Sequence, residues 1–346
     1  MELFATGFNA WNQLSFAQGN LPEEPDDLYG FTKVLSAATI ERPKNQKKTR
    51  QPDLQQNNPK LTKDPHTVRK DGHLILAGHG PSQHNLENLY ASAETATGEL
   101  LTIVQDSQHE GHHDSNKLVK HASLSSWSSS TTPDSTFTCT PPATQIAAFN
   151  TGFVILHSDG TVSTFGDPRF EACLGRDTDP PNPPPNLPGP VPDLHEIASA
   201  EDPIKHVTAG GSAVAALTTS GSVYVWGSRT LSSSSSSSKA AETSHHHRPG
   251  HGFMELSSIP NYTEIDGGKD VVDVALGEAH GIALTADGLV YVIGENANGQ
   301  LGLGELGRGV CNSNAWLQLQ FEAPEGFKIV GVGAGPRSSF ILTARI

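Results

Sequence analysis

The sequence predicts an all-β fold built from one repeated unit of strand, tight turn and strand. The chain of 346 residues holds 34 glycines and 24 prolines but only 17% charged residues, a composition typical of many turns and few long solvated helices. Three segments also superpose without a gap, residues 146–160, 207–221 and 274–288. A chain of this length permits one large domain, which we take to span residues 1–346.

Each of the three segments ends in a Ser-Gly or Asp-Gly pair, and a second run rich in β-branched residues follows it. Glycine adopts the positive φ that a tight connection between two twisted strands requires, so each pair indicates a β-hairpin. The turn residues are Asp159 and Gly160, Gly221, and Asp287 and Gly288.

Two weaker copies of the turn precede these three. Gly98 keeps the spacing of the later glycines, so we interpret it as an equivalent turn. The pair Asp71 and Gly72 lies too close to Gly98 for a full repeat, which predicts a degenerate unit in that region.

The two ends of the chain contain complementary parts of one repeat. Residues 332–346 superpose on 274–288, and residues 1–14 superpose on 288–301. An open array has no reason to divide a repeat in this way, whereas a closed ring gains paired edges from it. The sequence therefore predicts a closed β-propeller whose N- and C-terminal strands share one blade, with six turn positions when this blade is counted.

The prediction of a shared terminal blade names the residues that close the ring. It places Phe4 and Phe340 in the same sheet, and it matches Gly7 with Gly294 and Asn9 with Asn296. The ring-closure residues are Leu3, Phe4, Gly7, Leu14, Phe340 and Leu342.

A glycine-rich motif follows the last hairpin at Gly294, Asn296 and 299–302. Together with Gly277-Glu278-Ala279-His280 and the turn at 285–288, it resembles the regulator of chromosome condensation repeat. The resemblance implies a seven-bladed propeller, and the chain looks most like the small members of the alpha-tubulin-suppressor type.

The resemblance also implies what the protein binds. It predicts a non-enzymatic protein-interaction scaffold, either an accessory subunit in tRNA modification and diphthamide synthesis or a factor in chromatin-linked regulation. The implied partners are a small zinc protein, a histone-directed oxygenase or a small GTPase. The alternative function is guanine-nucleotide exchange on such a GTPase.

Charge and composition exclude several other classes. The net charge of −14 disfavours direct nucleic-acid binding, because acidic surfaces repel phosphates. No apolar run is long enough to span a bilayer, and the N-terminus lacks the pattern of a secretory signal. Three distant cysteines predict reduced thiols. We therefore expect a cytoplasmic or nuclear protein that is a monomer on its own.

Four polar insertions interrupt the β pattern, at about 41–65, 105–140, 176–200 and 229–262. Their Ser-, Pro- and His-rich composition predicts flexible surface loops. Two alternatives stay open. The basic run 42–50 could contact an acidic or nucleic-acid partner, and the prolines at 180–192 could bind SH3 or WW domains.

The sequence predicts no catalytic, cofactor or metal site. Residues 109–113 satisfy the H-E-x-x-H pattern of zinc proteases, but Gly111 and the polar flanks argue against the helix that this chemistry needs. The histidines near 245–251 and the Ser212 segment are interpreted as a loop and an inner strand. His280 is the one polar residue that we place near a possible partner face, with hydrogen bonding between blades as the alternative role.

Overall fold

The structure is a computed structural model. The residues that it describes are 1–10, 14–15, 25–37, 40–41, 67–70, 73–76, 92–105, 115–129, 132–198, 200–228, 256–304, 307 and 309–346.

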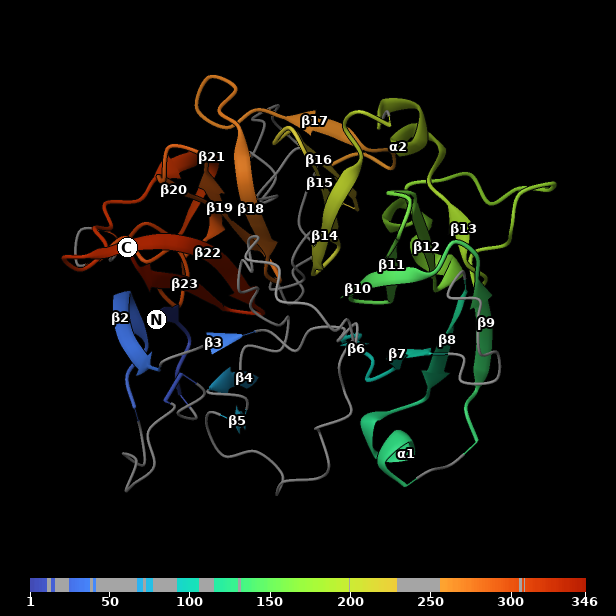
Figure 1. The fold of residues 1–346 in the computed structure, drawn as a ribbon, viewed down its shortest axis with the longest axis horizontal. Coiled ribbons are helices and arrows are strands. Elements are labelled where there is room, and N and C mark those ends of the chain that lie inside the picture. The colour runs from blue at the N-terminus through green and yellow to red at the C-terminus, as the bar shows by residue number, and fades with distance from the viewer. Residues whose placement is uncertain are drawn as a thin grey trace, which may run out of the picture.

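Within these residues the strands form six sheets, five with four strands and one with three. Figure 1 shows the sheets following one another around the molecule in chain order, from blue to red. The all-β prediction is confirmed. Of the six turn positions counted in the sequence, five fall in five different sheets and the sixth, Asp71 and Gly72, lies outside the described residues. A seventh blade stays a prediction.

In every sheet, strands that are neighbours in space pair in antiparallel fashion. From one edge to the other, the terminal sheet contains β2 (Leu28–Ser36), β1 (Glu2–Gly7), β23 (Ser338–Arg345) and β22 (Phe327–Gly335). The three-stranded sheet contains β3 (Ile40–Glu41), β4 (Thr67–Lys70) and β5 (His73–Leu76). The β6–β9 sheet contains β6 (Ser92–Glu94), β7 (Leu100–Gln105), β8 (Asn116–His121) and β9 (Ser135–Cys139).

The last three sheets follow the same scheme. The β10–β13 sheet contains β10 (Ala143–Phe149), β11 (Gly152–His157), β12 (Val162–Gly166) and β13 (Gly189–Pro190). The β14–β17 sheet contains β14 (Ile204–Gly210), β15 (Ala213–Thr218), β16 (Val223–Gly227) and β17 (Asn261–Thr263). The β18–β21 sheet contains β18 (Val271–Leu276), β19 (His280–Thr285), β20 (Val290–Glu295) and β21 (Asn312–Gln318).

In the described part of the chain, the helices that accompany these sheets are short. They are α1 (Leu124–Ser128), the 3-10 helix η2 (Pro168–Cys173) and α2 (Pro192–Ile197). None of the helices in the described segments is long and apolar enough to cross a membrane.

The predicted glycine turns connect the second and third strands of the last three sheets. Gly160, Gly221 and Gly288 have φ values of 86°, 106° and 84°. Each donates its backbone N–H to the carbonyl three residues earlier, at 3.1, 3.2 and 2.9 Å respectively. A residue with a Cβ rarely adopts this backbone region, so glycine fits these positions. The hairpin prediction is confirmed at all three.

Gly98 forms a different turn from the one that its spacing predicts. It has a φ of 88° and donates to the carbonyl of Thr95 at 3.0 Å, but it connects the first two strands of its sheet, β6 and β7. The prediction that Gly98 is equivalent to Gly160 is therefore wrong. The same turn residues suit a connection between the first and second strands of a sheet and one between the second and third. The other weak copy, Asp71 and Gly72, lies outside the described residues, although β4 and β5 on either side of it pair with each other.

The first and last strands of the chain lie side by side, as predicted. β1 pairs with β2 on one edge and with β23 on the other, so it is an inner strand of the terminal sheet. Its register places Phe4 opposite Ile341 and Ala5 opposite Phe340. Figure 1 shows the two chain ends at the same side of the molecule.

The predicted match between residues 1–14 and the last glycine-rich motif is confirmed in detail. The side-chain oxygen of Asn9 accepts a hydrogen bond from the backbone N–H of Leu14 at 3.0 Å. The side-chain oxygen of Asn296 accepts from Leu301 at the same distance. Both leucines are buried, with 1% and 0% exposure. The same asparagine-capped turn therefore occurs at both ends of the repeat pattern.

The core consists of apolar layers between the faces of neighbouring sheets. One layer lies between the β10–β13 and β14–β17 sheets and contains Phe149, Leu174 and Trp226. Another lies between the β18–β21 sheet and the terminal sheet and contains Phe4 and Leu301. These layers fix each sheet against the next one.

Polar side chains join the same sheets at one repeated position. Gln145, His206 and Asp273 each occupy an irregular position in the first strand of their sheet. Gln145 bonds both backbone groups of Val207, at 2.9 and 3.2 Å. His206 reaches the carbonyl of Val274 at 3.1 Å, and Asp273 accepts from the N–H of Val332 at 3.0 Å. We call these three side chains the junction residues.

Two of the predicted insertions contain ordered structure. Strands β8 and β9 lie within 105–140. Leu118 of β8 and Cys139 of β9 bury their side chains against the neighbouring sheet. Ser123 begins helix α1 by accepting from Ser126 at 3.1 Å. The prediction of a flexible insertion is wrong for these residues.

The proline-rich segment within 176–200 is also ordered. The guanidinium of Arg176 donates to the carbonyls of Pro183, Pro184 and Leu187 at 2.6, 3.1 and 2.9 Å. Strand β13 and helix α2 follow it, so a flexible loop is the wrong description of this segment. Most of the insertions at 41–65 and 229–262 lies outside the described residues.

Candidate interaction surface

The turns between the first and second strands of five sheets lie in one row, which we call the inner-turn row. It consists of residues 95–99, 150–151, 211–212, 277–279 and 336–337. In four of these sheets the strand before the turn ends in a run of buried residues, whereas β6 is only partly buried. The row therefore takes its position from the most rigid part of the fold.

Backbone contacts connect the turns of neighbouring sheets. Ala96 donates to the carbonyl of Asn150 at 3.1 Å, and Asn150 donates to that of Gly211 at 2.7 Å. Glu278 donates to the carbonyl of Pro336 at 2.9 Å. The turns of the β14–β17 and β18–β21 sheets approach each other closely. A Cβ on Gly211 would overlap the carbonyl oxygen of Glu278, so only glycine permits this approach. The row is thus continuous from the β6–β9 sheet to the terminal sheet.

In four of the five sheets, the end of the third strand adds a second set of bonds to the same turns. Phe8 donates to the carbonyl of Arg337 at 2.9 Å, and Asp167 donates to that of Thr151 at 2.9 Å. In the same way, the backbone N–H of Ser228 donates to the carbonyl of Ser212 at 3.0 Å. That of Glu295 donates to the carbonyl of Ala279 at 2.8 Å. These bonds hold the turns in a fixed geometry before any partner binds.

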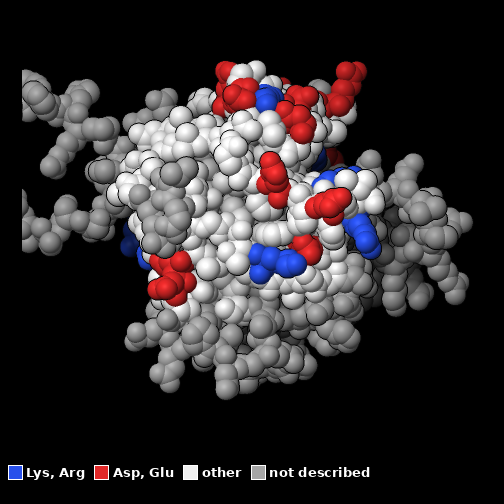
Figure 2. All heavy atoms as spheres, turned by 90° about the vertical axis from the view of Figure 1, so that its left-hand side faces the viewer, with Lys and Arg blue, Asp and Glu red and all other residues white. Residues whose placement is uncertain are grey.

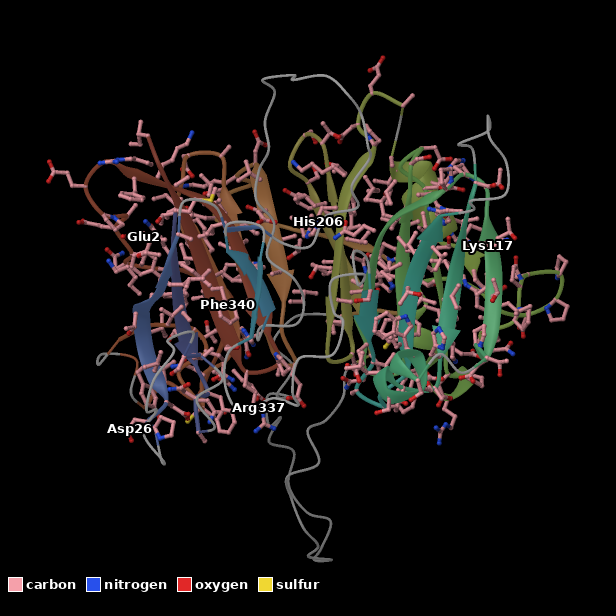
Figure 3. The ribbon with its side chains drawn as sticks, turned by 60° about the horizontal axis from the view of Figure 1, so that its bottom comes forward. Glu2, Asp26, Lys117, His206, Arg337 and Phe340 are labelled. Atoms are coloured by element: carbon pink, nitrogen blue, oxygen red, sulfur yellow. The ribbon has the colours of Figure 1, made fainter. Side chains whose placement is uncertain are left out.

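Exposed charged pairs lie on the row and beside it. The Nε atom of Arg337 lies 3.3 Å from a carboxylate oxygen of Glu278, and both side chains are about half exposed, at 55% and 50%. Figure 3 shows Arg337 at one end of the molecule, beyond the labelled Phe340. Arg169 lies 2.6 Å from Asp167, and its side-chain hydrogen bond lowers the pKa of that carboxyl to about 2. The row therefore presents charges of both signs.

The opposite ends of the sheets are more acidic. Lys269 contacts the carboxylates of Asp287 and Asp266, at 2.9 and 3.3 Å. Hydrogen bonds from Thr285 and Lys269 lower the pKa of Asp287, so it is ionised at neutral pH. Figure 2 shows acidic side chains gathered at the top of this view around a basic one. This end attracts cations rather than phosphates.

His280 does not lie on a partner face. Its side chain is 0% exposed, and Nε2 lies 3.2 Å from the carbonyl of Ser338 in the terminal sheet. Because a carbonyl only accepts, Nε2 carries the proton. Burial lowers the pKa of His280 to about 4, so the ring is neutral. The partner-face prediction is wrong, and the alternative role between blades fits. Its neighbour Glu278 is the exposed residue of this turn, and the sequence offered no signal that separated the two.

A cavity of about 470 Å³ between β9 and β12 is lined by His157 and Ser163, whose side chains are in hydrogen-bond contact. His157 donates from Nδ1 to the carbonyl of Pro141 at 2.9 Å, which leaves Nε2 to accept from Ser163. The sequence analysis missed this pair, since the two residues lie on adjacent strands of a hairpin. Its hydrogen bonds join the strands to the proline turn, which is a structural role.

The described residues contain no group of three or more His, Cys, Asp or Glu side chains that could hold a metal ion. The H-E-x-x-H segment at 109–113 lies outside them, as do the histidines near 245–251. Ser212 lies in the inner-turn row and is buried.

The comparisons with known proteins agree with this architecture. A family model described as the regulator of chromosome condensation (RCC1) repeat matches residues 271–300, which span β18 to Gln300. The human protein named regulator of chromosome condensation is 34% identical over 157 residues, which are 43% of this chain and 30% of that protein. A Xenopus laevis protein named Protein RCC2 homolog is 46% identical over 55 residues, 16% of this chain and 11% of the relative.

Solved structures show the same fold. Yeast RCC1 (Prp20) bound to Kap60 superposes with a TM-score of 0.50 at 14% identity, over 82% of this chain and 63% of that one. Another structure of Prp20p from Saccharomyces cerevisiae gives the same score and identity over 82% and 66%, and its title reports binding properties to Gsp1p and histones. The matches cover about a third or less of the curated relatives.

Sheets that repeat one strand register, joined by glycine-rich inner turns, define a β-propeller class of repeat protein. The repeat at 271–300 is matched as well, so the chain is similar to proteins of the regulator of chromosome condensation repeat family.

Proposed function

We propose that this protein is a non-enzymatic interaction scaffold that binds a protein partner through the inner-turn row. The observation that carries the proposal is the chain of contacts between the turns of five sheets, with backbone hydrogen bonds at three of the four junctions and close backbone packing of Gly211 on Glu278 at the fourth. A surface fixed in this way loses little conformational entropy on binding. The proposal includes a closed seven-bladed ring formed by residues 1–346.

The charged pair of Glu278 and Arg337 is the proposed recognition point within the row. Both side chains are half exposed, so a partner can compete for either one without breaking the fold. Charges of both signs at a rim contribute chiefly to specificity and association rate. A small zinc protein, a histone-directed oxygenase and a small GTPase are the partner classes that the family resemblance suggests, in the cytoplasm or the nucleus.

Affinity purification from the native organism at physiological salt, followed by mass spectrometry, tests the proposal. We expect the wild-type protein to recover a stoichiometric partner. The Arg337→Glu variant should lose this partner, and the double variant Glu278→Arg/Arg337→Glu should recover it only in part. Lys33→Glu is the matched control, because Lys33 is equally exposed but lies in β2, away from the row. Recovery of no stoichiometric partner, or equal loss with the control, would contradict the proposal.

Guanine-nucleotide exchange is the second candidate, and the similarity to the human regulator of chromosome condensation favours it. Exchange requires only a surface that distorts the nucleotide site of a GTPase. Release of mant-GDP from a panel of small GTPases measures it directly. Acceleration that Arg337→Glu abolishes would place exchange ahead of scaffolding, whereas no acceleration of any GTPase would remove it.

A further inference from the structure

The outer edge of the β14–β17 sheet carries an exposed aromatic pair. Tyr262 of β17 lies opposite Tyr224 of β16, with ring centroids 6.0 Å apart at 64°. Tyr262 is 52% exposed. Tyr224 packs against the core layer that contains Trp226, which holds the pair in place. We call Tyr224, Tyr262 and strand β17 the tyrosine edge.

Strand β17 is the outermost strand of its sheet in the described residues. It pairs through Asn261, Tyr262 and Thr263 with β16, on one side only. Edge strands of this kind accept a further strand through main-chain hydrogen bonds. An added strand would place alternate side chains on the face that carries the two tyrosines.

Asp202 interacts electrostatically with Tyr224 of the tyrosine edge, and further acidic residues lie in the adjoining segments of the chain. The segment that includes α2 and leads into β14 carries four acidic residues, and Glu264 follows β17 directly. The four are Asp193, Glu196, Glu201 and Asp202. Figure 1 shows α2 and β17 at the same end of the molecule, and Ala198 packs against the same core layer as Tyr224.

The hydrogen bonds of this region favour the charged form of Asp202. Partial burial opposes ionisation of Asp202, but hydrogen bonds from the side chain and backbone of Ser220 outweigh it and lower its pKa. Lys205 is the one lysine or arginine in the segments 192–205 and 256–264. It faces Asp273, Asp202 and Asp270, so its charge is already balanced within the fold. The edge therefore has a net negative charge.

We propose that the tyrosine edge binds an extended, basic segment of a partner protein, which adds a strand beside β17. Arginine or lysine side chains of that segment stack on the tyrosine rings and pair with the flanking carboxylates. The charge complementarity selects this occupant over a nucleic acid or an anionic membrane, whose phosphates the carboxylates repel. This surface is separate from the inner-turn row, so it adds a second site to the proposed scaffold.

Fluorescence polarisation of the full-length protein with a labelled ten-residue peptide of alternating arginine and threonine tests the site. We expect saturable binding near physiological salt that Tyr262→Ala weakens about five- to tenfold, whereas Tyr262→Phe retains it. Tyr262 is half exposed, so the variants keep the fold, which an unchanged melting temperature verifies. Because the probe is a peptide alone, this result does not depend on the partner of the inner-turn row.

Two further arms separate a site from general attraction to an acidic protein. Glu264→Gln beside the edge should weaken binding, and Glu325→Gln in the turn before β22, which removes the same charge, should not. A peptide with N-methylated alternate residues should bind at least tenfold more weakly, since it cannot donate to an edge strand. Equal effects of the two glutamine variants, unchanged binding by Tyr262→Ala, or full binding of the methylated peptide would each overturn the proposal.

Discussion

Replacing Leu3 by alanine is expected to destabilise the whole protein. Leu3 is 0% exposed in the middle of β1, and it packs in a cluster with Leu14, Leu35, Phe340 and Leu342. Removing a buried leucine side chain costs about 2–5 kcal/mol, including the cavity that it leaves. This loss is a large fraction of a total stability of about 5–15 kcal/mol.

The size of the effect can be stated as a melting temperature. A domain of 346 residues unfolds with an entropy of about 0.7 kcal/mol per kelvin, so a loss of about 3 kcal/mol lowers Tm by about 4 °C. Thermal melts followed by circular dichroism, with urea titrations in parallel, measure both quantities. Lys33→Ala is the control, because its ion pair with Glu2 is on the surface and contributes about 0–1 kcal/mol.

A larger perturbation tests the pairing of the two chain ends. Deletion of residues 1–14 removes β1 and leaves β2 and β23 without their common neighbour. We expect unfolding or aggregation, since two edges become free to pair with other molecules. A truncated protein that melts at the wild-type temperature, or a Leu3→Ala variant indistinguishable from Lys33→Ala, would refute this reasoning.

Three further outcomes follow from single positions. Gly211→Ala should lower the free energy of unfolding by more than about 1–2 kcal/mol, because the φ of 55° disfavours a side chain and the new Cβ would overlap the carbonyl of Glu278. Gly288→Ala meets open space, so it should cost about 1–2 kcal/mol for its backbone conformation alone. Urea titrations measure both values. Asn296→Ala should cost about 1–3 kcal/mol, because three backbone groups lose the partner that its amide supplies. The folded pKa of His280, about 4, lies below the usual value of 6.5, so the unfolded chain takes up the proton first. Stability should therefore fall between about pH 6.5 and 4, and His280→Gln should show a smaller fall over that range in urea midpoints.

Much of the architecture follows from local sequence signals. The glycine turns and the match between residues 1–14 and 288–301 depend on hairpin chemistry, which neighbouring residues determine. The same locality explains the error at Gly98, since its turn residues suit either connection in a sheet. Strands β8 and β9 were missed because serine-rich flanks concealed the alternation that buries Leu118 and Cys139.

The candidate surfaces depend on contacts between sheets, which the sequence does not display. Glu278 and Arg337 lie far apart in the chain and meet only when their sheets pack. The nearest available signal was the small residues Gly210, Gly211 and Gly277, which permit the close approach of the turns. Similarly, His280 and Glu278 are two residues apart, and packing alone decides which one is exposed.

The junction residues have a consequence for how such a protein can evolve. Gln145, His206 and Asp273 occupy the same place in successive repeats, yet each offers a different combination of donors and acceptors to the next sheet. If the first and third were exchanged, a carboxylate would face the carbonyl of Val207, which needs a donor. These three sheets share one strand order, yet each is matched to its own neighbour, so a protein in which they were shuffled would carry unmatched polar groups at the junctions.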